Sequence, residues 1–585
     1  MATMATNSDL AHLFEEFTAI LEILGANKFK VLAFQKVART LDSLADDAAE
    51  LARTPGALEA IDGIGASSAA KIREFVERGN IAELDELRAK VPPGLLGLLG
   101  ISGLGPKTIK LFWEQGGVTD KASLKTKLAT GELLQLAGMG EKKLKGIEES
   151  IALSEQSAGR IRLGAALPLA ERVVAMMLAV KGVRRVAYAG SLRRGKETIG
   201  DVDILCASDD PAAAHAAFRD QPGVAKVLVS GDTKTSIVTN DGVQIDLRTL
   251  PDASFGAALM YFTGSKEHNV KLRERAIAQG YRLNEYGLFP DDGDAAPQHR
   301  GVQPIVAGTE EDVFAKLGLA WVPPELREDR GEILVAEKKA IPTLIELSDL
   351  KAELHAHTRA SDGSMTIEGL VDAAKGKGFH TIAVTDHSKS SVQANGLSPE
   401  RLRAHVGAIH AIAAKRSDII VLAGSEVDIL ADGRLDYDDE LLALLDLVVA
   451  SPHNSLKQEG DVATKRLIKA IEHPAVRILG HPTGRIINGR TGLEPDLRRV
   501  FAAAKANNVA LELNANPLRL DLRDTHVKAA LDAGCLISIN CDTHERSNLD
   551  LARYGILTAR RGWLTAEQCI NCWDAKRLLA WLKRK

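Results

Sequence analysis

The chain has 585 residues, and its 45% hydrophobic and 26% charged residues exclude disordered, collagenous and coiled-coil proteins and predict about three to five folded domains. A net charge of −4 excludes nucleic-acid binding through bulk positive charge, and no apolar stretch reaches the ~20 residues of a membrane span. The first residues have no secretory pattern and the five cysteines are too few for a disulfide framework, so we expect a cytoplasmic protein without membrane association.

Residues 8–155 have the pattern of short amphipathic helices, and three Gly-x-Gly turns recur among them. A Gly-x-Gly turn that opens a helix can present several backbone N–H groups to a phosphate without a cationic surface. The other interpretation is three ordinary helix-to-helix turns that use glycine for its positive φ. The repetition favours phosphate contact, with the better matches at Gly63, Gly65, Gly103 and Gly105, the last pair followed by Lys107.

Residues 183–250 change to the alternation of strands, with a helix between them, and predict a mixed sheet. Asp201 and Asp203 are two residues apart on a predicted strand, so both carboxylates leave the same face and need a cation between them. Asp246, on another predicted strand, can join them to hold two Mg²⁺ ions. Gly190 and Ser191 lie at a strand-to-helix turn, with Arg194 close behind, and can bind a triphosphate.

From residue 350 onward strands and helices alternate, which predicts a parallel sheet closed into a barrel. This segment contains 11 of the 15 histidines. A lone histidine at a strand end is usually structural, but here many ionisable residues follow consecutive strands, which indicates a site for about three Zn²⁺, Mn²⁺ or Fe²⁺ ions. The candidate ligands are His355, His357, Asp362, His387, Glu426, His453, His481, Asp542 and His544. The Cys569-x-x-Cys572 pair has no second pair at metal spacing, and we interpret it as structural thiols.

The segment GSLRRG followed by GDVDIL resembles the nucleotidyltransferases of DNA polymerase family X, and the resemblance spans roughly residues 8–320. It implies that Asp201, Asp203 and Asp246 are catalytic metal ligands, that Gly190, Ser191 and Arg194 contact the incoming dNTP, and that the N-terminal turns are helix-hairpin-helix motifs on DNA backbone. It further implies nucleotide contacts by Tyr261, Phe262, Gly264, Asn269 and Arg273. Lys71 stands where lyase members have their Schiff-base lysine, although Phe34 replaces the tyrosine expected nearby.

The barrel motifs HAH, SDG, TDH, GSE, SPH, GHP and CDTH resemble the PHP (polymerase and histidinol phosphatase) domain, which implies a distorted (βα)7 barrel with a trinuclear phosphoesterase site. We expect a multidomain α and α/β protein with a polymerase-beta-like palm and thumb. The expected divisions are an N-terminal helical domain (1–85), fingers (86–158), palm (159–262), thumb (263–322), linker (323–349) and PHP domain (350–585).

The combination is typical of bacterial and archaeal family X polymerases. It predicts a template-directed, gap-filling repair polymerase with a metal-dependent 3′-to-5′ exonuclease in the barrel. The expected partners are gapped or primed DNA, dNTPs and other repair proteins; the expected metals at the polymerase site are Mg²⁺ or Mn²⁺, and we expect a monomer. Two alternatives stay open: a barrel that acts as a 3′-end phosphatase, and a DNA-binding repair scaffold with one inactive site.

Overall fold

The computed structural model describes residues 7–42, 48–61, 63–99, 101, 104–156, 160–293 and 297–583. The chain divides into two compact units, Met1–Ala158 with Asn488–Arg490, and Gly159–Ile487 with Thr491–Lys585. Within the described ranges, no helix is both long enough and apolar enough to cross a membrane.

The N-terminal unit is helical, as the sequence predicts, and no strand occurs among its described residues. The rings of Phe14, Phe17 and Phe34 lie with their centres 5.1 to 5.8 Å apart in the core of this unit. Its α-helices are α1 (Asn7–Leu24), α2 (Lys28–Asp42), α3 (Ala48–Ala52), α4 (Ala66–Arg78), α5 (Ala82–Arg88), α6 (Pro106–Glu114), α7 (Lys121–Ala129) and α8 (Glu141–Gln156).

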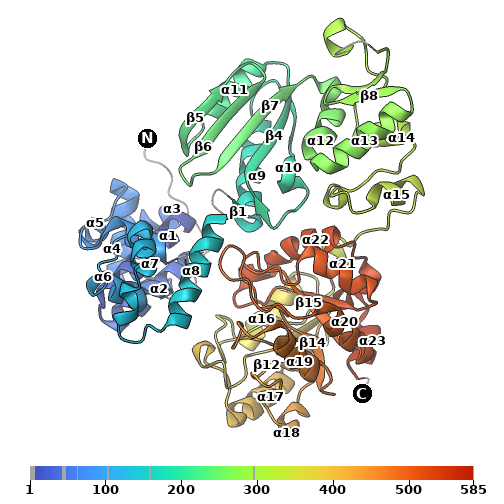
Figure 1. The fold of residues 1–585 in the computed structure, drawn as a ribbon. Coiled ribbons are helices and arrows are strands. Elements are labelled where there is room, and N and C mark those ends of the chain that lie inside the picture. The colour runs from blue at the N-terminus through green and yellow to red at the C-terminus, as the bar shows by residue number, and fades with distance from the viewer. Residues whose placement is uncertain are drawn as a thin grey trace. The chain divides into compact units, whose positions relative to one another are not determined.

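A five-stranded mixed sheet opens the second unit, with the strand order β2-β4-β7-β6-β5 (Figure 1). Strands β4 and β7 run parallel and the other neighbours run antiparallel, which places the parallel pair inside the sheet. The strands are β2 (Val183–Tyr188), β4 (Asp201–Ser208), β5 (Val224–Ser230), β6 (Lys234–Thr239) and β7 (Gln244–Leu250). A short pair, β1 (Ile161–Arg162) and β3 (Thr198–Ile199), lies beside helices α9 (Leu163–Leu178) and α10 (Gly190–Arg193), and α11 (Pro211–Arg219) packs on β6.

The next segment folds around its own core of apolar side chains, among them Met260, Leu272 and Phe314. It contains α12 (Phe255–Thr263), α13 (Lys266–Ala278), the hairpin β8 (Tyr281–Asn284) and β9 (Gly287–Pro290), α14 (Glu310–Lys316) and α15 (Glu332–Glu337). Residues 323–349, which the sequence led us to expect as a linker, add Leu326, Ala336 and Leu344 to this core. Prolines and charged residues suggested a loop there, but four of the charged side chains are largely buried in ion pairs: Glu325, Arg327, Glu328 and Glu332.

A seven-stranded parallel barrel completes the second unit, with strands β10 to β16 paired in chain order (drawn from yellow to red in Figure 1). An isolated parallel bridge between Ala356 and Thr543 joins the first strand region to the last, so the expected (βα)7 barrel is confirmed as a nearly closed one. The strands are β10 (Ala352–Glu353), β11 (Thr381–Val384), β12 (Ile420–Asp428), β13 (Leu447–Ser451), β14 (Val476–Leu479), β15 (Ala510–Asn514) and β16 (Ile537–Asn540).

Helices surround the barrel, and their apolar faces share a core with the strands. They are α16 (Ile367–Gly376), α17 (Pro399–Ala413), α18 (Asp439–Leu442), α19 (Gly460–Ile471), α20 (Leu497–Ala506), α21 (Asp524–Asp532), α22 (Ala552–Arg561) and α23 (Ala575–Leu582). The polar side chains at the carboxyl ends of the strands therefore lie together on one face of the barrel.

Two candidate metal centres

Three aspartates meet on the parallel strand pair of the mixed sheet. Asp203 on β4 and Asp246 on β7 are direct neighbours in the register, and Asp201 precedes Asp203 by two residues on the same face. One carboxylate oxygen from each of the three lies within 4.8 Å of the other two. Burial, then the charges of Asp201 and Asp246, raise the pKa of Asp203 to about 7, and the Lys234 ammonium lies 2.6 Å from Asp246. This crowding of negative charge suits divalent cations.

The backbone at Gly190 passes directly beside the triad. Gly190 has φ +60°, and a Cβ atom there would lie only 2.3 Å from Oδ2 of Asp203, so the position requires glycine for both conformation and space. The backbone N–H of Ala189 donates to the carbonyl of Asp203 at 2.8 Å, which fixes the turn against β4. Ser191 follows in α10, and Arg194 caps the end of that helix.

The turn after α12 lies against Arg194. Its Nη1 donates to the carbonyl of Thr263 at 2.5 Å. The following Gly264 has φ +69°, and a Cβ atom there would lie 3.2 Å from the same Nη1. Asn269 on α13 donates from Nδ2 to the carbonyl of Tyr261 at 2.7 Å, and the ring of Phe262 packs edge to face on that of Tyr261. The structure thus joins Arg194, the 261–264 turn and Asn269 by direct contacts; Arg273 lies one helical turn beyond Asn269 on α13.

In the barrel, Glu426 is the central residue of a second cluster. Its carboxylate is fully buried at the end of β12, and four histidines from other strand ends approach it. The distances from carboxylate oxygen to imidazole nitrogen are 2.8 Å for His387, 2.8 Å for His481, 3.2 Å for His453 and 3.4 Å for His355. One carboxylate thus connects side chains that lie more than 100 residues apart in sequence.

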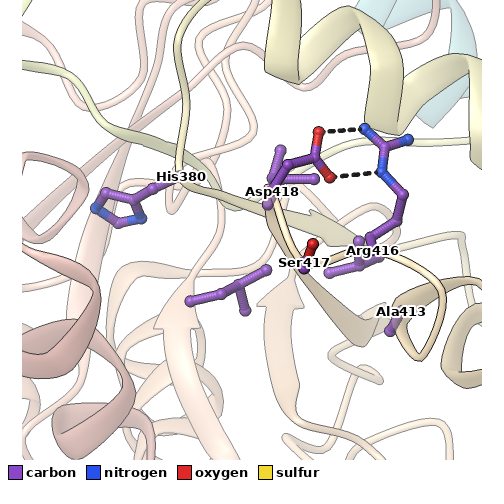
Figure 2. A pocket seen from close by; sticks show the side chains of 8 residues that line it. His380, Ala413, Arg416, Ser417 and Asp418 are labelled. Atoms are coloured by element: carbon purple, nitrogen blue, oxygen red, sulfur yellow. Dashed lines mark hydrogen bonds and ion pairs between the residues drawn. The ribbon is translucent and has the colours of Figure 1, made fainter.

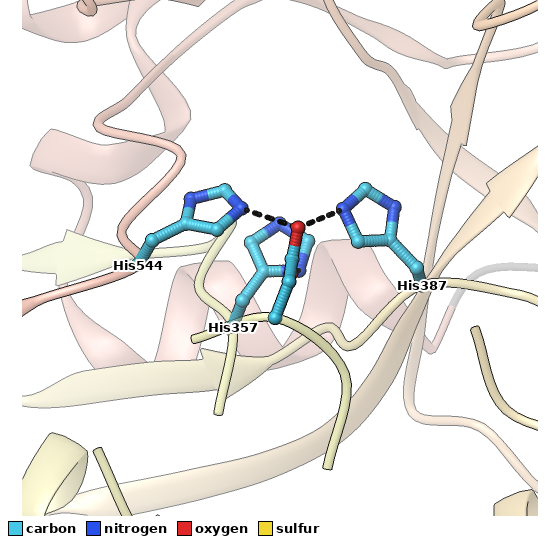
Figure 3. Close-up of side chains that lie close together, drawn as sticks. His357, His387 and His544 are labelled. Atoms are coloured by element: carbon cyan, nitrogen blue, oxygen red, sulfur yellow. Dashed lines mark ion pairs between the residues drawn. The ribbon is translucent and has the colours of Figure 1, made fainter. Parts of the chain in front are cut away.

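Two further carboxylates complete the cluster. Asp542 lies 3.1 Å from Nε2 of His357 and 3.6 Å from Nε2 of His355. Figure 3 shows His387 and His544 directed at a single carboxylate from two sides, with His357 behind it; the carboxylate is that of Asp362, at 3.5 and 3.3 Å from the first two rings. All nine predicted ligands therefore converge at the carboxyl-terminal face of the barrel.

The chemistry of these atoms fits metal ions. Nε2 of His355 and Nδ1 of His357 are buried without a hydrogen-bond partner among the described residues, and the close imidazole contacts of both Glu426 oxygens lack hydrogen-bond geometry. Burial lowers the pKa of His387, but Glu426 and Asp362 outweigh it and raise the pKa to about 11; carboxylates likewise raise the pKa of His544 to about 9. The ligand atoms fall into three groups, and within each group they all lie within 4.8 Å of one another. The groups are His357, Asp362, His387 and His544; His355, His357 and Asp542; and His387, Glu426 and His453.

Acidic residues behind the ligands were missed by the sequence analysis. Nδ1 of His355 lies 2.7 Å from Glu512, which is fully buried in the middle of β15, and Nδ1 of His453 contacts Asp428 at the end of β12. Such contacts fix the ring orientation and leave the other nitrogen for a metal. A glutamate within the apolar strand Val509–Asn514 and an aspartate two residues after Glu426 were the available signals.

In the N-terminal unit, Gly65 and Gly105 are the N-caps of α4 and α6, and Gly63 has φ +102°. Lys107 lies in the first turn of α6, whereas Gly103 is outside the described residues. The Lys71 ammonium lies 2.9 Å from Glu83 and 3.1 Å from the hydroxyl of Ser67. The Lys71 ammonium is thus held by Glu83 and Ser67, and its role in lyase chemistry stays a prediction.

A separate hollow of about 430 Å³ lies at the amino ends of β11 and β12, far from the ligand face of the barrel (Figure 2). Both ring nitrogens of His380 are occupied, by the hydroxyl of Thr381 at 2.7 Å and the carbonyl of Trp573 at 2.9 Å. Arg416 is paired with Asp418 and Asp372. Because its polar groups already have partners, this hollow has no set of groups directed at a ligand.

Family models match the chain in four places: a helix-hairpin-helix domain over 5–81, a SAM-like helix-hairpin-helix tandem over 95–151, the DNA polymerase beta thumb over 258–328 and the PHP domain over 353–516. With the triad and the nine-residue cluster, this order defines a polymerase-beta-like core joined to a PHP domain. The chain is 36% identical over 584 residues to DNA polymerase/3′-5′ exonuclease PolX of Bacillus subtilis (strain 168), which covers 98% of this chain and 99% of the relative. The chain therefore belongs to the PolX family of family X DNA polymerases, as the sequence predicts.

Two further relatives match only part of the chain. DNA polymerase lambda of Rattus norvegicus is 27% identical over 358 residues, covering 55% of this chain and 57% of the relative. A probable phosphatase of Thermoanaerobacter sp. (strain X514) is 26% identical over 247 residues, covering 40% of this chain and 96% of the relative.

Proposed function

We propose that the protein is a template-directed DNA polymerase that fills short gaps during DNA repair and removes 3′-terminal nucleotides with its barrel. The observation that carries this proposal is the presence of two complete and separate ligand sets in one chain, the aspartate triad and the nine-residue barrel cluster. The full-length similarity to a relative named for both activities supports it.

At the triad, Asp201, Asp203 and Asp246 would hold Mg²⁺ or Mn²⁺, which supply charge stabilisation for the attacking 3′-oxygen and the departing pyrophosphate. In this step the primer 3′-oxygen forms a bond to the α-phosphorus of the dNTP, and the bond to pyrophosphate breaks. Arg194 and the backbone and hydroxyl at Gly190 and Ser191 would bind the triphosphate. The turn at Tyr261, Phe262 and Gly264 would flank the sugar, and Asn269 and Arg273 would contact the nascent base pair.

At the barrel, the nine ligands would hold about three Zn²⁺, Mn²⁺ or Fe²⁺ ions, which polarise a phosphodiester and lower the pKa of water. Water would attack the phosphorus of the terminal phosphodiester, and the bond from this phosphorus to the 3′-oxygen of the preceding nucleotide would break. One proton of the water passes to that 3′-oxygen, so the terminal nucleotide leaves as a 5′-monophosphate and the shortened primer ends in a 3′-hydroxyl. Glu512 and Asp428 hold the rings of His355 and His453 in the orientation that presents the other nitrogen to a metal. His544 is the most exposed of the ligand histidines, with a third of its side chain accessible, so it lies at the entrance of the site.

The N-terminal turns would contact DNA backbone and give binding without sequence preference. Gly63, Gly65, Gly105 and Lys107 open α4 and α6 and would face phosphates there, together with Gly103 of the same motif. Since phosphate contacts release counterions, affinity for gapped DNA should fall as salt rises. An affinity that stays constant from low to physiological salt would contradict this assignment.

A second candidate for the barrel is a phosphatase that cleans blocked 3′ ends. The similarity of 40% of the chain to almost the full length of a probable phosphatase favours it. The two candidates differ in substrate, since a phosphatase releases phosphate from a 3′-phosphorylated primer and leaves a 3′-hydroxyl primer at full length.

The test uses a 5′-labelled primer that borders a one-nucleotide gap, with Mn²⁺. With dNTPs, the parent chain should extend the primer, and Asp201→Ala/Asp203→Ala should not. Without dNTPs, the parent and this double variant should both shorten the primer, and His355→Ala should not. Shortening that disappears in the aspartate variant would assign the nuclease to the triad instead, and failure of the parent to shorten any 3′-hydroxyl primer would favour the phosphatase.

A further inference from the structure

Helix α22 of the barrel domain packs against the loop that leads into the aspartate triad. In this loop Gly195 has φ +65°, and a Cβ atom there would lie 3.2 Å from Cβ of Leu557. From the same helix, Arg561 donates from Nη1 to the backbone carbonyl of Arg194 at 2.7 Å. The barrel domain thus contacts the backbone of the residue that we assign to the triphosphate.

The contact extends to the side chain of Arg194 through a shared carboxylate. Oε1 of Glu328 lies 2.9 Å from Nε of Arg194 and 2.9 Å from Nη1 of Arg561. On its other side Arg561 contacts Asp524, at 2.8 Å from Nη2, so the four groups form an alternating series of charges. Only 3% of the Arg561 side chain and 10% of the Glu328 side chain are exposed, so solvent screens these charges weakly.

Glu328 also belongs to the segment that holds the nucleotide-binding turn. The neighbouring carbonyl of Arg327 accepts the N–H of Ser265 at 2.9 Å, directly after Gly264. Arg194 is therefore held at Nε by Glu328 and at Nη1 by the carbonyl of Thr263 in that turn. Among the described contacts its Nη2 makes no hydrogen bond, which leaves this nitrogen for an anionic ligand.

A second arginine of the barrel holds the same loop. Nη2 of Arg485, which follows β14, lies 2.7 Å from the carboxylate of Glu197 and 2.5 Å from the carbonyl of Leu520. The loop between Gly190 and Asp201 is thus fixed to the barrel domain at Arg194, Gly195 and Glu197.

We infer that Arg561 is a positioning residue for dNTP binding, and that the barrel domain therefore completes the nucleotide site of the polymerase. The inference rests on the proposed role of Arg194. Arg561 fixes the backbone of Arg194 and orients Glu328, and Glu328 sets the direction of the Arg194 guanidinium.

The test measures single-nucleotide gap filling by two variants of the full chain, Arg561→Gln and Arg561→Lys. The lysine variant keeps the buried positive charge and serves if the glutamine variant folds poorly. We expect the KM for dNTP to rise about tenfold with Arg561→Gln, because a guanidinium displaced by about 1 Å loses most of its contact energy with a phosphate. Affinity for gapped DNA and primer shortening by the barrel should stay unchanged. The matched control is Arg553→Gln, which removes another ion pair of α22 across the same boundary, to Glu171, away from Arg194.

A double-mutant cycle with Arg194→Gln separates positioning from a general structural effect. If Arg561 acts through Arg194, then Arg561→Gln should raise the KM for dNTP little further once Arg194 is replaced. Additive effects, or equal effects of Arg561→Gln and Arg553→Gln, would overturn the inference. If Arg194→Gln leaves the KM for dNTP unchanged, the proposed role of Arg194 in binding the triphosphate is wrong. If Arg194→Gln raises this KM but Arg561→Gln does not, only the positioning role of Arg561 is wrong.

Discussion

Asp203 and Asp246 are direct register partners on the parallel strands β4 and β7, so their carboxylates leave the sheet side by side. Because burial and neighbouring carboxylates raise the pKa of Asp203 to about 7, a bound cation would favour the charged form of this carboxyl. We expect Asp203→Asn to reduce gap filling by about 10³-fold or more, since the loss affects the charge stabilisation of the transition state. Primer extension with saturating dNTP measures this, and primer shortening by the barrel should persist in the variant.

Gly190→Ala should damage the triad without removing a ligand. The added Cβ would meet Oδ2 of Asp203 at 2.3 Å and displace the carboxylate, so we expect kcat for gap filling to fall about 10- to 100-fold. The control is Gly223→Ala, which shares the positive φ but has no heavy atom within 4 Å of its new Cβ. That variant should lose stability only, and equal losses of kcat in both variants would show that backbone strain is the cause instead.

Glu512→Gln tests the acidic residues behind the barrel ligands. The amide removes the negative partner of Nδ1 in His355, so we expect metal affinity at the barrel to fall about 10- to 100-fold. Metal content after dialysis against graded free Zn²⁺ or Mn²⁺ measures this. Glu472→Gln, on an exposed residue after α19, is the control. Metal binding as tight in Glu512→Gln as in the parent would exclude an orienting role for this glutamate.

Asp524 should make stability depend on pH in the acid range. Burial raises its pKa, but the guanidinium groups of Arg561 and Arg330 outweigh burial and lower the pKa to about 2. Because an unfolded aspartate titrates near pH ~3.9, the stabilisation is fully present above that pH and is lost as the pH falls toward 2. We expect Asp524→Asn to lose about 2 kcal/mol of unfolding free energy at neutral pH and the difference from the parent to shrink below pH ~4. Urea unfolding of both proteins at several pH values checks this, and a difference that stays constant down to pH ~3 would refute it.

The local sequence pattern was enough to predict most of the residues that meet in the two candidate metal centres. Alternation placed Asp201 and Asp203 on one face of a strand, and the ligand residues from His355 to His544 each follow a recognisable buried strand. The class of fold followed from the same periodicities. These signals succeed because each depends on a few consecutive residues.

The buried ionic contacts could not be predicted in this way. Arg327 is fully buried and bonded to Glu310, and Arg561 meets Glu328 across more than 200 residues of sequence. A charged residue that will be buried by a distant partner has the same local pattern as one in solvent, so residues 323–349 resembled a linker. Glu512 escaped notice for the same reason, because its partner His355 lies 157 residues away in the sequence.

The bridge between Ala356 and Thr543 has a consequence for the order in which activities arise during synthesis of the chain. The barrel ligands begin at His355 and end at His544, so the ribosome must synthesise the chain through His544 before all nine side chains can meet. The aspartate triad needs only the segment up to Asp246 for its ligands, yet Arg561 comes after the last barrel ligand. A nascent chain can therefore bring the three aspartates together early, whereas the nine barrel ligands meet only once His544 has been synthesised, and the contact of Arg561 with the nucleotide site forms later still.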